Sequence, residues 1–182
     1  MSNELRDSKI AILATDGVEQ VELEQSRQAV QDAGARTTLL SLEDGEIQAM
    51  NSDINPADTF AVEGKVSDAS IDDYDALILP GGTCSPDKLR MDEHAVSFVR
   101  DFVNAGKPVG VICHGPWTLA EADVLQGRRI TSWPSIRTDL RRAGAEVVDE
   151  EVVIDGNLIS SRNPGDLPAF CAALVKQVAG RS

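Results

Sequence analysis

The sequence predicts an α/β fold with a mainly parallel sheet covered by helices on both faces. Two continuous apolar runs, Asp75–Pro80 (DALILP) and Pro108–Ile112 (PVGVI), are typical of strands that are buried on both sides. Helical patterns alternate with such runs along the chain, as in parallel α/β proteins. The 182 residues suffice for a substantial core, and we expect residues 1–182 to form a single domain.

The first half of the chain supplies a strand, a helix, a strand and a mixed region. Lys9–Ala14 is short and rich in β-formers, whereas Val21–Gly34 carries apolar residues at helical spacing and stops at a glycine. Arg36–Leu42 is the next predicted strand. The polar region Glu43–Ser70 predicts short strands and turns.

The second half continues the alternation. Beyond the two buried strands, the predicted elements are a helix at His94–Ala105, a helix from about Gly115 to Ala122, a helix at Pro134–Ala143, a hairpin of Val152–Ile154 and Leu158–Ser160, and a helix at Leu167–Ala179. Asp155-Gly156 is a strong turn signal for the hairpin. Asp166 is positioned to cap the last helix.

Composition limits the classes of function. Hydrophobic residues make up 42% and aromatic residues 4%, so the core must be aliphatic. A net charge of −13 repels phosphate backbones and anionic membranes, so we expect no nucleic-acid or membrane partner. No apolar stretch is long enough to span a bilayer, and the charged start does not resemble a secretory signal.

Three widely spaced cysteines, Cys84, Cys113 and Cys171, form neither a disulfide framework nor a zinc motif. This pattern favours a reducing cytoplasm. Cys84 has two interpretations, a plain loop residue or a resolving thiol for Cys113.

Unusual residues follow three of the predicted strands, and the carboxyl ends of parallel strands share one edge of a sheet, where ligands gather. They are Thr15–Glu19, Pro80–Thr83 and Cys113–Trp117. We therefore expect the functional site at this edge.

Cys113 is the candidate reactive centre. It lies between a strand and a helix, and Gly115 stands where the second glycine of a nucleophile elbow would be. The helix that follows would favour the thiolate through its N–H groups. The alternative is a small buried hydrophobic residue, which is what most free cysteines are.

Three further residues have both a functional and an ordinary interpretation. His114 is either a base or a helix-start residue. The other histidine, His94, lies in a helical stretch with nothing reactive nearby, so any histidine base would be His114. Gly82 is either an oxyanion donor or a loop breaker. Glu19 is either a carboxyl acting on the sulfur or a first-turn acid.

The sequence resembles the ThiJ/PfpI family, the superfamily of the Parkinsonism-associated deglycase and of the PfpI intracellular cysteine peptidases. The resemblance rests on segments such as TDGVEQVEL, DYDALILPGG and GKPVGVICHGPWTLAEADVLQGRRITSWPSIRTDL, and it covers nearly the whole chain. It implies a flavodoxin-like sandwich, related to class I glutamine amidotransferase domains, that assembles as a homodimer or a trimer of dimers.

The resemblance also implies roles for individual residues. Cys113 matches the nucleophile, His114 its neighbouring histidine, and Glu19 the glutamate that hydrogen-bonds the sulfur. Gly82 and the backbone of His114 match the oxyanion-hole donors. Asp87 matches the acid that reaches the histidine of a neighbouring subunit in PfpI-type peptidases. In this sequence the loop is one residue longer than in the shorter family members, and the acid is Asp rather than Glu. Ser85-Pro86-Asp87 is also typical of an ordinary helix start.

The leading hypothesis is therefore a hydrolase of the deglycase type, with Cys113 attacking methylglyoxal-type adducts of proteins in stress protection. An intracellular peptidase using Cys113, His114 and Asp87 is the alternative. A stress protein that senses oxidation through Cys113 or acts as a holdase is a third possibility. No metal or organic cofactor is implied.

Overall fold

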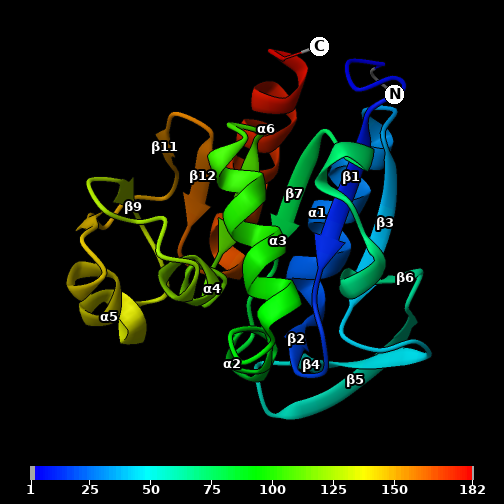
Figure 1. Ribbon diagram of the computed structural model, residues 1–182, viewed down its shortest axis with the longest axis horizontal. Coiled ribbons are helices and arrows are strands. Elements are labelled where there is room, and N and C mark those ends of the chain that lie inside the picture. Colours follow the sequence, from blue (N-terminus) through cyan, green and yellow to red (C-terminus); the bar gives the residue numbers. More distant parts are fainter. Residues whose placement is uncertain (1–2, 182) are drawn as a thin grey trace.

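The computed structural model describes residues 3–181 and contains a seven-stranded sheet at its centre (Figure 1). The strand order is β11-β12-β8-β7-β1-β3-β6. The strands span Lys9–Leu13 (β1), Arg36–Ser41 (β3), Gly64–Lys65 (β6), Ala76–Leu79 (β7), Val109–Ile112 (β8), Val153–Asp155 (β11) and Leu158–Ser161 (β12). Every pair in this sheet is parallel except β11 with β12. The mixed α/β class and the parallel sheet predicted from the sequence are thus confirmed.

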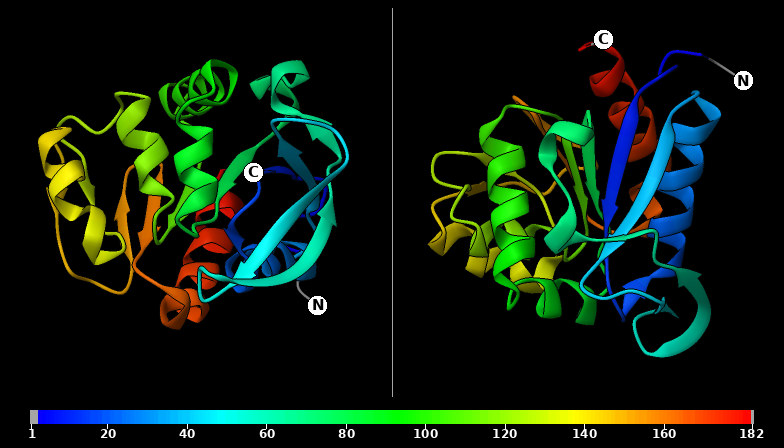
Figure 2. Two further views of the ribbon diagram at one scale, coloured as in Figure 1. Left: turned by 90° about the horizontal axis from the view of Figure 1, so that it is seen from below. Right: turned by 45° about the vertical axis from the view of Figure 1, so that its right-hand side comes forward.

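Helices cover both faces of the sheet (Figure 2). On one face, α1 (Gln20–Asp32) packs against α6 (Leu167–Ala179). On the other, α3 (Glu93–Asn104) packs against α4 (Pro116–Glu121), which also contacts α2 (Cys84–Leu89) and α5 (Arg137–Arg142). Single 3-10 turns occupy Val66–Asp68, Ile71–Asp73, Pro134–Ile136 and Pro164–Asp166.

The core consists of two layers separated by the sheet. In β1, Ile10 and Ile12 join the layer under α1 and α6, while Ala11 and Leu13 join the layer under α3. This alternation explains the continuous apolar run, because both faces of the strand are buried.

Two small sheets flank the main one. Val18–Glu19 (β2), Glu46–Asn51 (β4) and Asn55–Ala61 (β5) form a three-stranded sheet, and Arg129–Ile130 (β9) pairs with Glu146–Val147 (β10). The short strands within Glu43–Ser70 agree with the sequence prediction. β9 and β10 are absent from it, because two residues are too few to produce a recognisable pattern.

Three helices differ in detail from the prediction. α2 begins at Cys84, so Ser85, Pro86 and Asp87 lie inside its first turns and Ser85 is not the N-cap. Asp166 does occupy the N-cap position of α6, but its side chain makes no capping hydrogen bond. Its carboxylate accepts from Arg162 instead. The predicted helix Pro134–Ala143 is divided into a 3-10 turn and α5.

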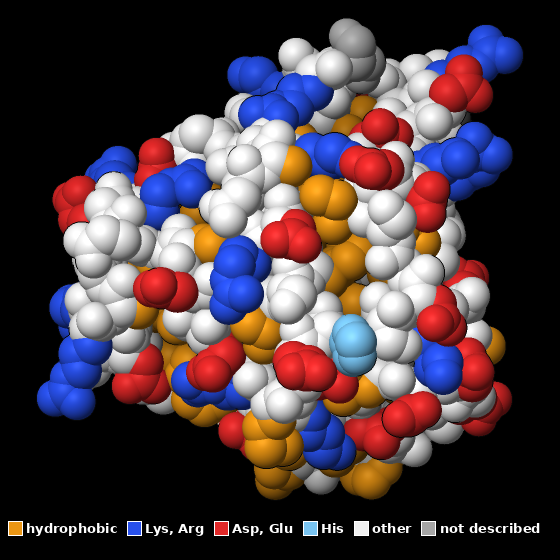
Figure 3. Space-filling view, viewed as in Figure 1, with side chains coloured by type: hydrophobic (Ala, Val, Ile, Leu, Met, Phe, Trp, Pro, Cys, Tyr) orange, Lys and Arg blue, Asp and Glu red, His pale blue; other side chains and the backbone are white. Residues whose placement is uncertain are grey.

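Acidic and basic side chains are interspersed on the face shown in Figure 3. Among residues 3–181, no helix has both the length and the apolar character needed to cross a membrane. Over the same residues, no group of three or more His, Cys, Asp or Glu side chains is arranged to hold a metal ion.

Phe102 tests the layer under α3, since its side chain is fully buried. We expect Phe102→Ala to lower the free energy of unfolding by about 3–5 kcal/mol through lost transfer energy and a residual cavity. Met91, which is 78% exposed, supplies the control. Met91→Ala should change stability by less than about 0.5 kcal/mol. Urea denaturation of both variants measures the difference, and equal midpoints would contradict this assignment of the core.

Candidate active site

The loops after β1, β7 and β8 meet at one edge of the sheet, as the topology predicts, and enclose a cleft of about 530 Å³. The β4–β5 hairpin closes one side of this cleft. The residues that line it are Glu19, Glu22, Ser52, Asp53, Gly82, Thr83, Cys113, His114, Trp117, Trp133, Ser135 and Pro164.

Cys113 occupies a sharp turn between β8 and α4, with φ at +62°. Such a backbone conformation costs a non-glycine residue about 1–3 kcal/mol and persists where surrounding structure enforces it. Here the Cys113 N–H donates to the carbonyl of Ser161, and its carbonyl accepts from the Trp133 N–H. A side chain at Gly115 would lie 2.5 Å from the Leu79 carbonyl oxygen, so only glycine fits there.

Two backbone N–H groups point at the Cys113 sulfur, from Gly82 and His114. Gly82 has φ at +79°, and a Cβ on it would collide with the Gly17 carbonyl oxygen. Its lack of a side chain therefore allows the β7 loop to approach the loop after β1, while at Gly81 a Cβ would lie 2.7 Å from the Cys113 Cβ, so that glycine allows the close approach to the cysteine. The two donors expected from the sequence thus lie together at the sulfur.

The carboxyl beside the sulfur belongs to Glu22 and not to Glu19. Glu22 is fully buried beside Cys113, and its Oε1 accepts from the Gly81 N–H at 2.8 Å, while its Oε2 has no hydrogen-bond partner within residues 3–181. Glu19 is the residue before α1 and turns the other way. Its carboxylate accepts from the N–H groups of Ser52 and Asp53 at 2.8 and 3.0 Å. The predicted contact between Glu19 and the sulfur is therefore wrong.

Burial raises the pKa of Glu22 to about 8, and the Gly81 N–H opposes this shift. The carboxyl is thus mainly protonated at neutral pH and can donate to the sulfur. Burial also raises the pKa of the Cys113 thiol, and a charged Glu22 would raise it further. The N–H groups of Gly82 and His114 act in the opposite direction. The effect of desolvation on the Cys113 pKa therefore outweighs the thiolate stabilisation that the sequence suggested. When Glu22 is neutral, its charge makes no further contribution to the raised pKa of Cys113.

The His114 ring lies between the cysteine and the cleft wall. Its Nδ1 is 3.2 Å from the Cys113 Sγ, and its Nε2 is 3.3 Å from the Ser135 Oγ and 3.5 Å from the Thr83 Oγ1. Burial lowers the pKa of His114, which leaves the imidazole neutral at pH 7. A neutral ring with one nitrogen on the thiol can accept its proton.

Two indole rings lie next to this imidazole. Trp133 stacks on His114 with centroids 5.8 Å apart, and Trp117 lies at 5.7 Å in a tilted arrangement. The indole N–H of Trp117 donates to Asp139, which anchors that wall to α5. Contact with both indoles limits the space in which the ring can turn.

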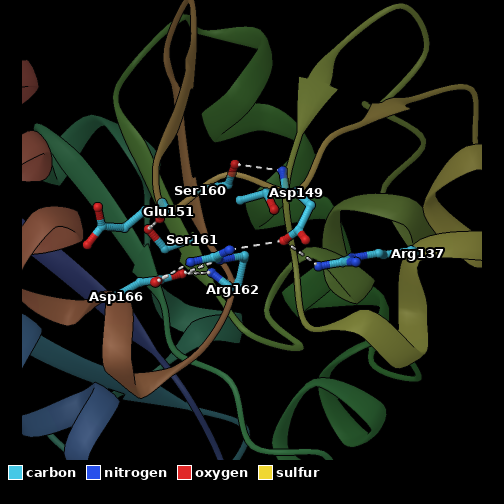
Figure 4. Close-up of polar contacts among 8 residues, drawn as sticks. Arg137, Asp149, Glu151, Ser160, Ser161, Arg162 and Asp166 are labelled. Carbon is cyan, nitrogen blue, oxygen red and sulfur yellow. Dashed lines mark hydrogen bonds and ion pairs between the residues drawn. The ribbon is translucent and has the colours of Figure 1, made fainter.

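An ion-pair cluster fixes the rim of the cleft near Pro164 (Figure 4). Arg162 donates to both oxygens of Asp166 and to Asp149, which also pairs with Arg137. These arginines hold the pKa of the Asp149 carboxyl below its usual range. The cluster ties the loop between β12 and α6 to the segment that follows β10.

Asp87, Cys84 and Cys171 are not part of the described cleft. Asp87 is exposed on α2 and makes no side-chain hydrogen bond within residues 3–181, so its reach to a neighbouring subunit stays a prediction. Cys84 is exposed on the same helix. Cys171 lies on α6 with its sulfur 3.6 Å from the Gln25 carbonyl oxygen, and burial raises its pKa to about 11.

The sequence analysis missed several residues of the cleft. They are Glu22, Ser52, Asp53, Thr83, Ser135 and the two tryptophans as ring-holding residues. Glu22 carried a usable signal, since it lies four residues before Ser26 and eight before Val30 on the buried stripe of α1. A carboxyl at an apolar position is uncommon and often functional.

The model of the DJ-1/PfpI family matches residues 8–177. The chain belongs to the DJ-1/PfpI family. This confirms the resemblance found in the sequence, and the flavodoxin-like sheet agrees with solved structures of the family.

Relatives of similar length carry two kinds of name. A protein of Escherichia coli (strain K12) named protein/nucleic acid deglycase 2 is 41% identical over 164 residues, 89% of this chain and 92% of that protein. A Bacillus subtilis (strain 168) protein named "Putative cysteine protease YraA" is 41% identical over 163 residues, 89% of this chain and 93% of that protein.

A solved two-domain protein of Anabaena variabilis, with DJ-1/ThiJ/PfpI-like and ferritin-like domains, superposes with a TM-score of 0.87 at 34% identity. The match covers 94% of this chain and 48% of that one, so this chain spans about half of the two-domain protein.

The pH dependence of Cys113 alkylation distinguishes the two glutamates. In the unaltered protein we expect two ionisation steps in the rate, because the charge that forms on Glu22 near pH 8 acts on the neighbouring sulfur. Glu22→Gln should show one step. Glu19→Gln should keep two, since Glu19 binds backbone N–H groups of the hairpin. Iodoacetamide kinetics read by mass spectrometry at Cys113 provide the measurement. The reverse pattern would indicate that Glu19, and not Glu22, is the carboxyl that acts on the Cys113 sulfur.

Glu22 should also make stability depend on pH. Its pKa is about 8 in the folded protein against an ordinary 4.5, so the folded state holds an extra proton between these values. The resulting stabilisation is fully present below pH 4.5 and is lost as pH rises through 8, with a slope of up to about 1.4 kcal/mol per pH unit between them. Relative to Glu22→Gln, the unaltered protein should lose stability over this interval in urea titrations. Parallel curves for the two proteins would refute the burial effect.

Proposed function

We propose that this chain is a hydrolase of the deglycase type with Cys113 as nucleophile, acting on methylglyoxal-type adducts of proteins in protection against carbonyl stress. The observation that supports this most directly is the position of one sulfur between two backbone N–H donors and a buried carboxyl. This set provides a nucleophile, an oxyanion site and a proton carrier at one point.

The chemistry fits an aminocarbinol, the product of an amine and the aldehyde carbon of methylglyoxal. The Cys113 thiolate displaces the amine, which leaves with a proton, and a hemithioacetal forms. Glu22 then moves a proton from the sulfur-bearing carbon to the adjacent carbonyl carbon, and the hydroxyl proton on the first carbon passes to the carbonyl oxygen of the second. The N–H groups of Gly82 and His114 hold the oxyanion during this step. The resulting thioester is hydrolysed by water.

The reaction balances without an external oxidant. Adduct and water give the free amine and a 2-hydroxy acid, because one carbon is oxidised while its neighbour is reduced. A carboxyl with a pKa of about 8 suits this proton transfer, since both of its forms are accessible near neutral pH. The sequence assigned the proton to Glu19 or His114, and the geometry favours Glu22 over Glu19.

The proposal includes the surroundings of the reaction. We propose a cytoplasmic protein that associates with itself, as a homodimer or a trimer of dimers, and whose partners are small carbonyl adducts or peptides. The acidic surface remains an argument against nucleic-acid and membrane partners.

Turnover of a methylglyoxal-treated peptide and of casein tests the proposal. We expect release of the free amine and a 2-hydroxy acid from the peptide, no cleavage of casein, and loss of turnover in Cys113→Ala. Cys171→Ala is the matched control, because that thiol lies on α6 outside the cleft, and it should keep full activity.

Asp87→Ala separates the two enzyme hypotheses. A peptidase that orients His114 through Asp87 of a neighbouring subunit would lose activity in this variant. For the deglycase we expect activity within about twofold of the unaltered protein, because Asp87 is an exposed side chain away from the cleft. Casein cleavage abolished by Asp87→Ala would replace the deglycase with the peptidase. Suppressed aggregation of a client protein without turnover would indicate the holdase.

A further inference from the structure

The turn between β4 and β5 reaches across the cleft toward His114. Ser52 and Asp53 at its tip have φ values of +51° and +70°, which turn both N–H groups toward the Glu19 carboxylate. Each of the two oxygens of Glu19 accepts one of these N–H groups. The contact fixes the tip and thereby places the Asp53 side chain.

Asp53 binds Thr83 at two points. Its Oδ1 accepts from the Thr83 N–H at 2.7 Å, and its Oδ2 is 2.9 Å from the Thr83 Oγ1. An ionised carboxylate has no proton to donate, so the Thr83 hydroxyl is the donor. The hydroxyl oxygen then offers only lone pairs to its other neighbour, the His114 Nε2 at 3.5 Å.

We propose that Asp53 is a positioning residue that, through the hydroxyl of Thr83, holds His114 in the tautomer with its proton on Nε2 and leaves Nδ1 free to accept the proton of Cys113. This inference rests on the proposed function for its catalytic meaning. The orienting acid comes from the same chain, from a hairpin about thirty residues before Thr83.

The proton transfer follows from this arrangement. The proton of the Cys113 thiol passes to the His114 Nδ1 over 3.2 Å, which gives a thiolate and an imidazolium. The Nε2–H of the imidazolium donates to Thr83, and the negative charge of Asp53 lies one residue beyond. Asp53 raises the pKa of His114 against the larger lowering caused by burial.

Other charged groups face the ring less directly. Glu22 of α1 lies beside the Cys113 sulfur, and Glu19 accepts from the Ser52 N–H at the hairpin tip. Arg90, which directly follows α2, packs over Trp117 at 5.4 Å and pairs with Glu121 of α4. The Ser135 hydroxyl on the remaining side is neutral and can donate or accept, so it does not choose a tautomer.

Nitrogen-15 NMR of the histidine side chains tests the proposal without any turnover. The chain contains two histidines, so the spectrum holds one signal set for His114 and one for His94 as an internal reference. In the unaltered protein above the pKa of His114, we expect the shifts of an Nε2–H tautomer. Asp53→Asn and Thr83→Val should both reduce the population of this tautomer, and Asp53→Asn should lower the pKa of His114.

Two further variants serve as controls. Thr83→Ser keeps the hydroxyl and should retain the tautomer, which separates the hydrogen bond from packing. Asp44→Asn removes the same charge from the exposed loop before β4 and should leave the His114 signals unchanged.

The outcomes are separate from those of the proposed function. An Nδ1–H tautomer in the unaltered protein, or an unchanged tautomer in both Asp53→Asn and Thr83→Val, would overturn the role of Asp53. Failure to turn over glycated peptide with the expected NMR result would refute the deglycase and leave the positioning role intact.

Discussion

The buried contact between the Glu22 carboxyl and the Cys113 sulfur is the constraint on which the rest of the site depends. Two groups that both favour their neutral forms in an apolar environment are held together, and burial raises the pKa of each. The Gly81 N–H donates a hydrogen bond that helps to keep the carboxyl in place. Burial therefore keeps both groups mainly protonated near neutral pH, whereas a solvated glutamate would be ionised there.

This contact requires an unusually close approach of three segments. Gly81 brings the β7 loop against Cys113, Gly82 brings it against the Gly17 carbonyl after β1, and the cysteine itself adopts a left-handed backbone. The parallel sheet makes this possible because it delivers the ends of β1, β7 and β8 to one edge. The backbone strain at the cysteine is balanced by hydrogen bonds to Ser161 and Trp133, from elements far apart in the sequence.

The fold could be predicted because strands buried on both faces leave continuous apolar runs, as in β7 and β8. Cys113 and Gly82 could be found because the end of a parallel strand restricts where a reactive side chain can lie. The two glutamates are harder to separate. Both lie within one turn of the same helix start, and only the buried stripe of Glu22, Ser26 and Val30 tells which carboxyl faces the sulfur.

The contribution of Asp53 could not be predicted in this way. Its position depends on a hairpin whose tip has two left-handed residues, and on a carboxylate from another element that binds their N–H groups. No local pattern in the polar region Glu43–Ser70 encodes that approach. The two-residue strands β9 and β10 could not be predicted for a related reason, since their pairing depends on neighbouring segments and not on their own residues.

The burial of Cys113 limits the size of the molecules that can react with it. Its side chain is only 6% exposed, and two indole rings flank the histidine beside it. A reagent must therefore be small, or must extend a slender group from a larger body, as the end of a lysine or arginine side chain does. The same walls that orient the imidazole thus decide which molecules reach the sulfur.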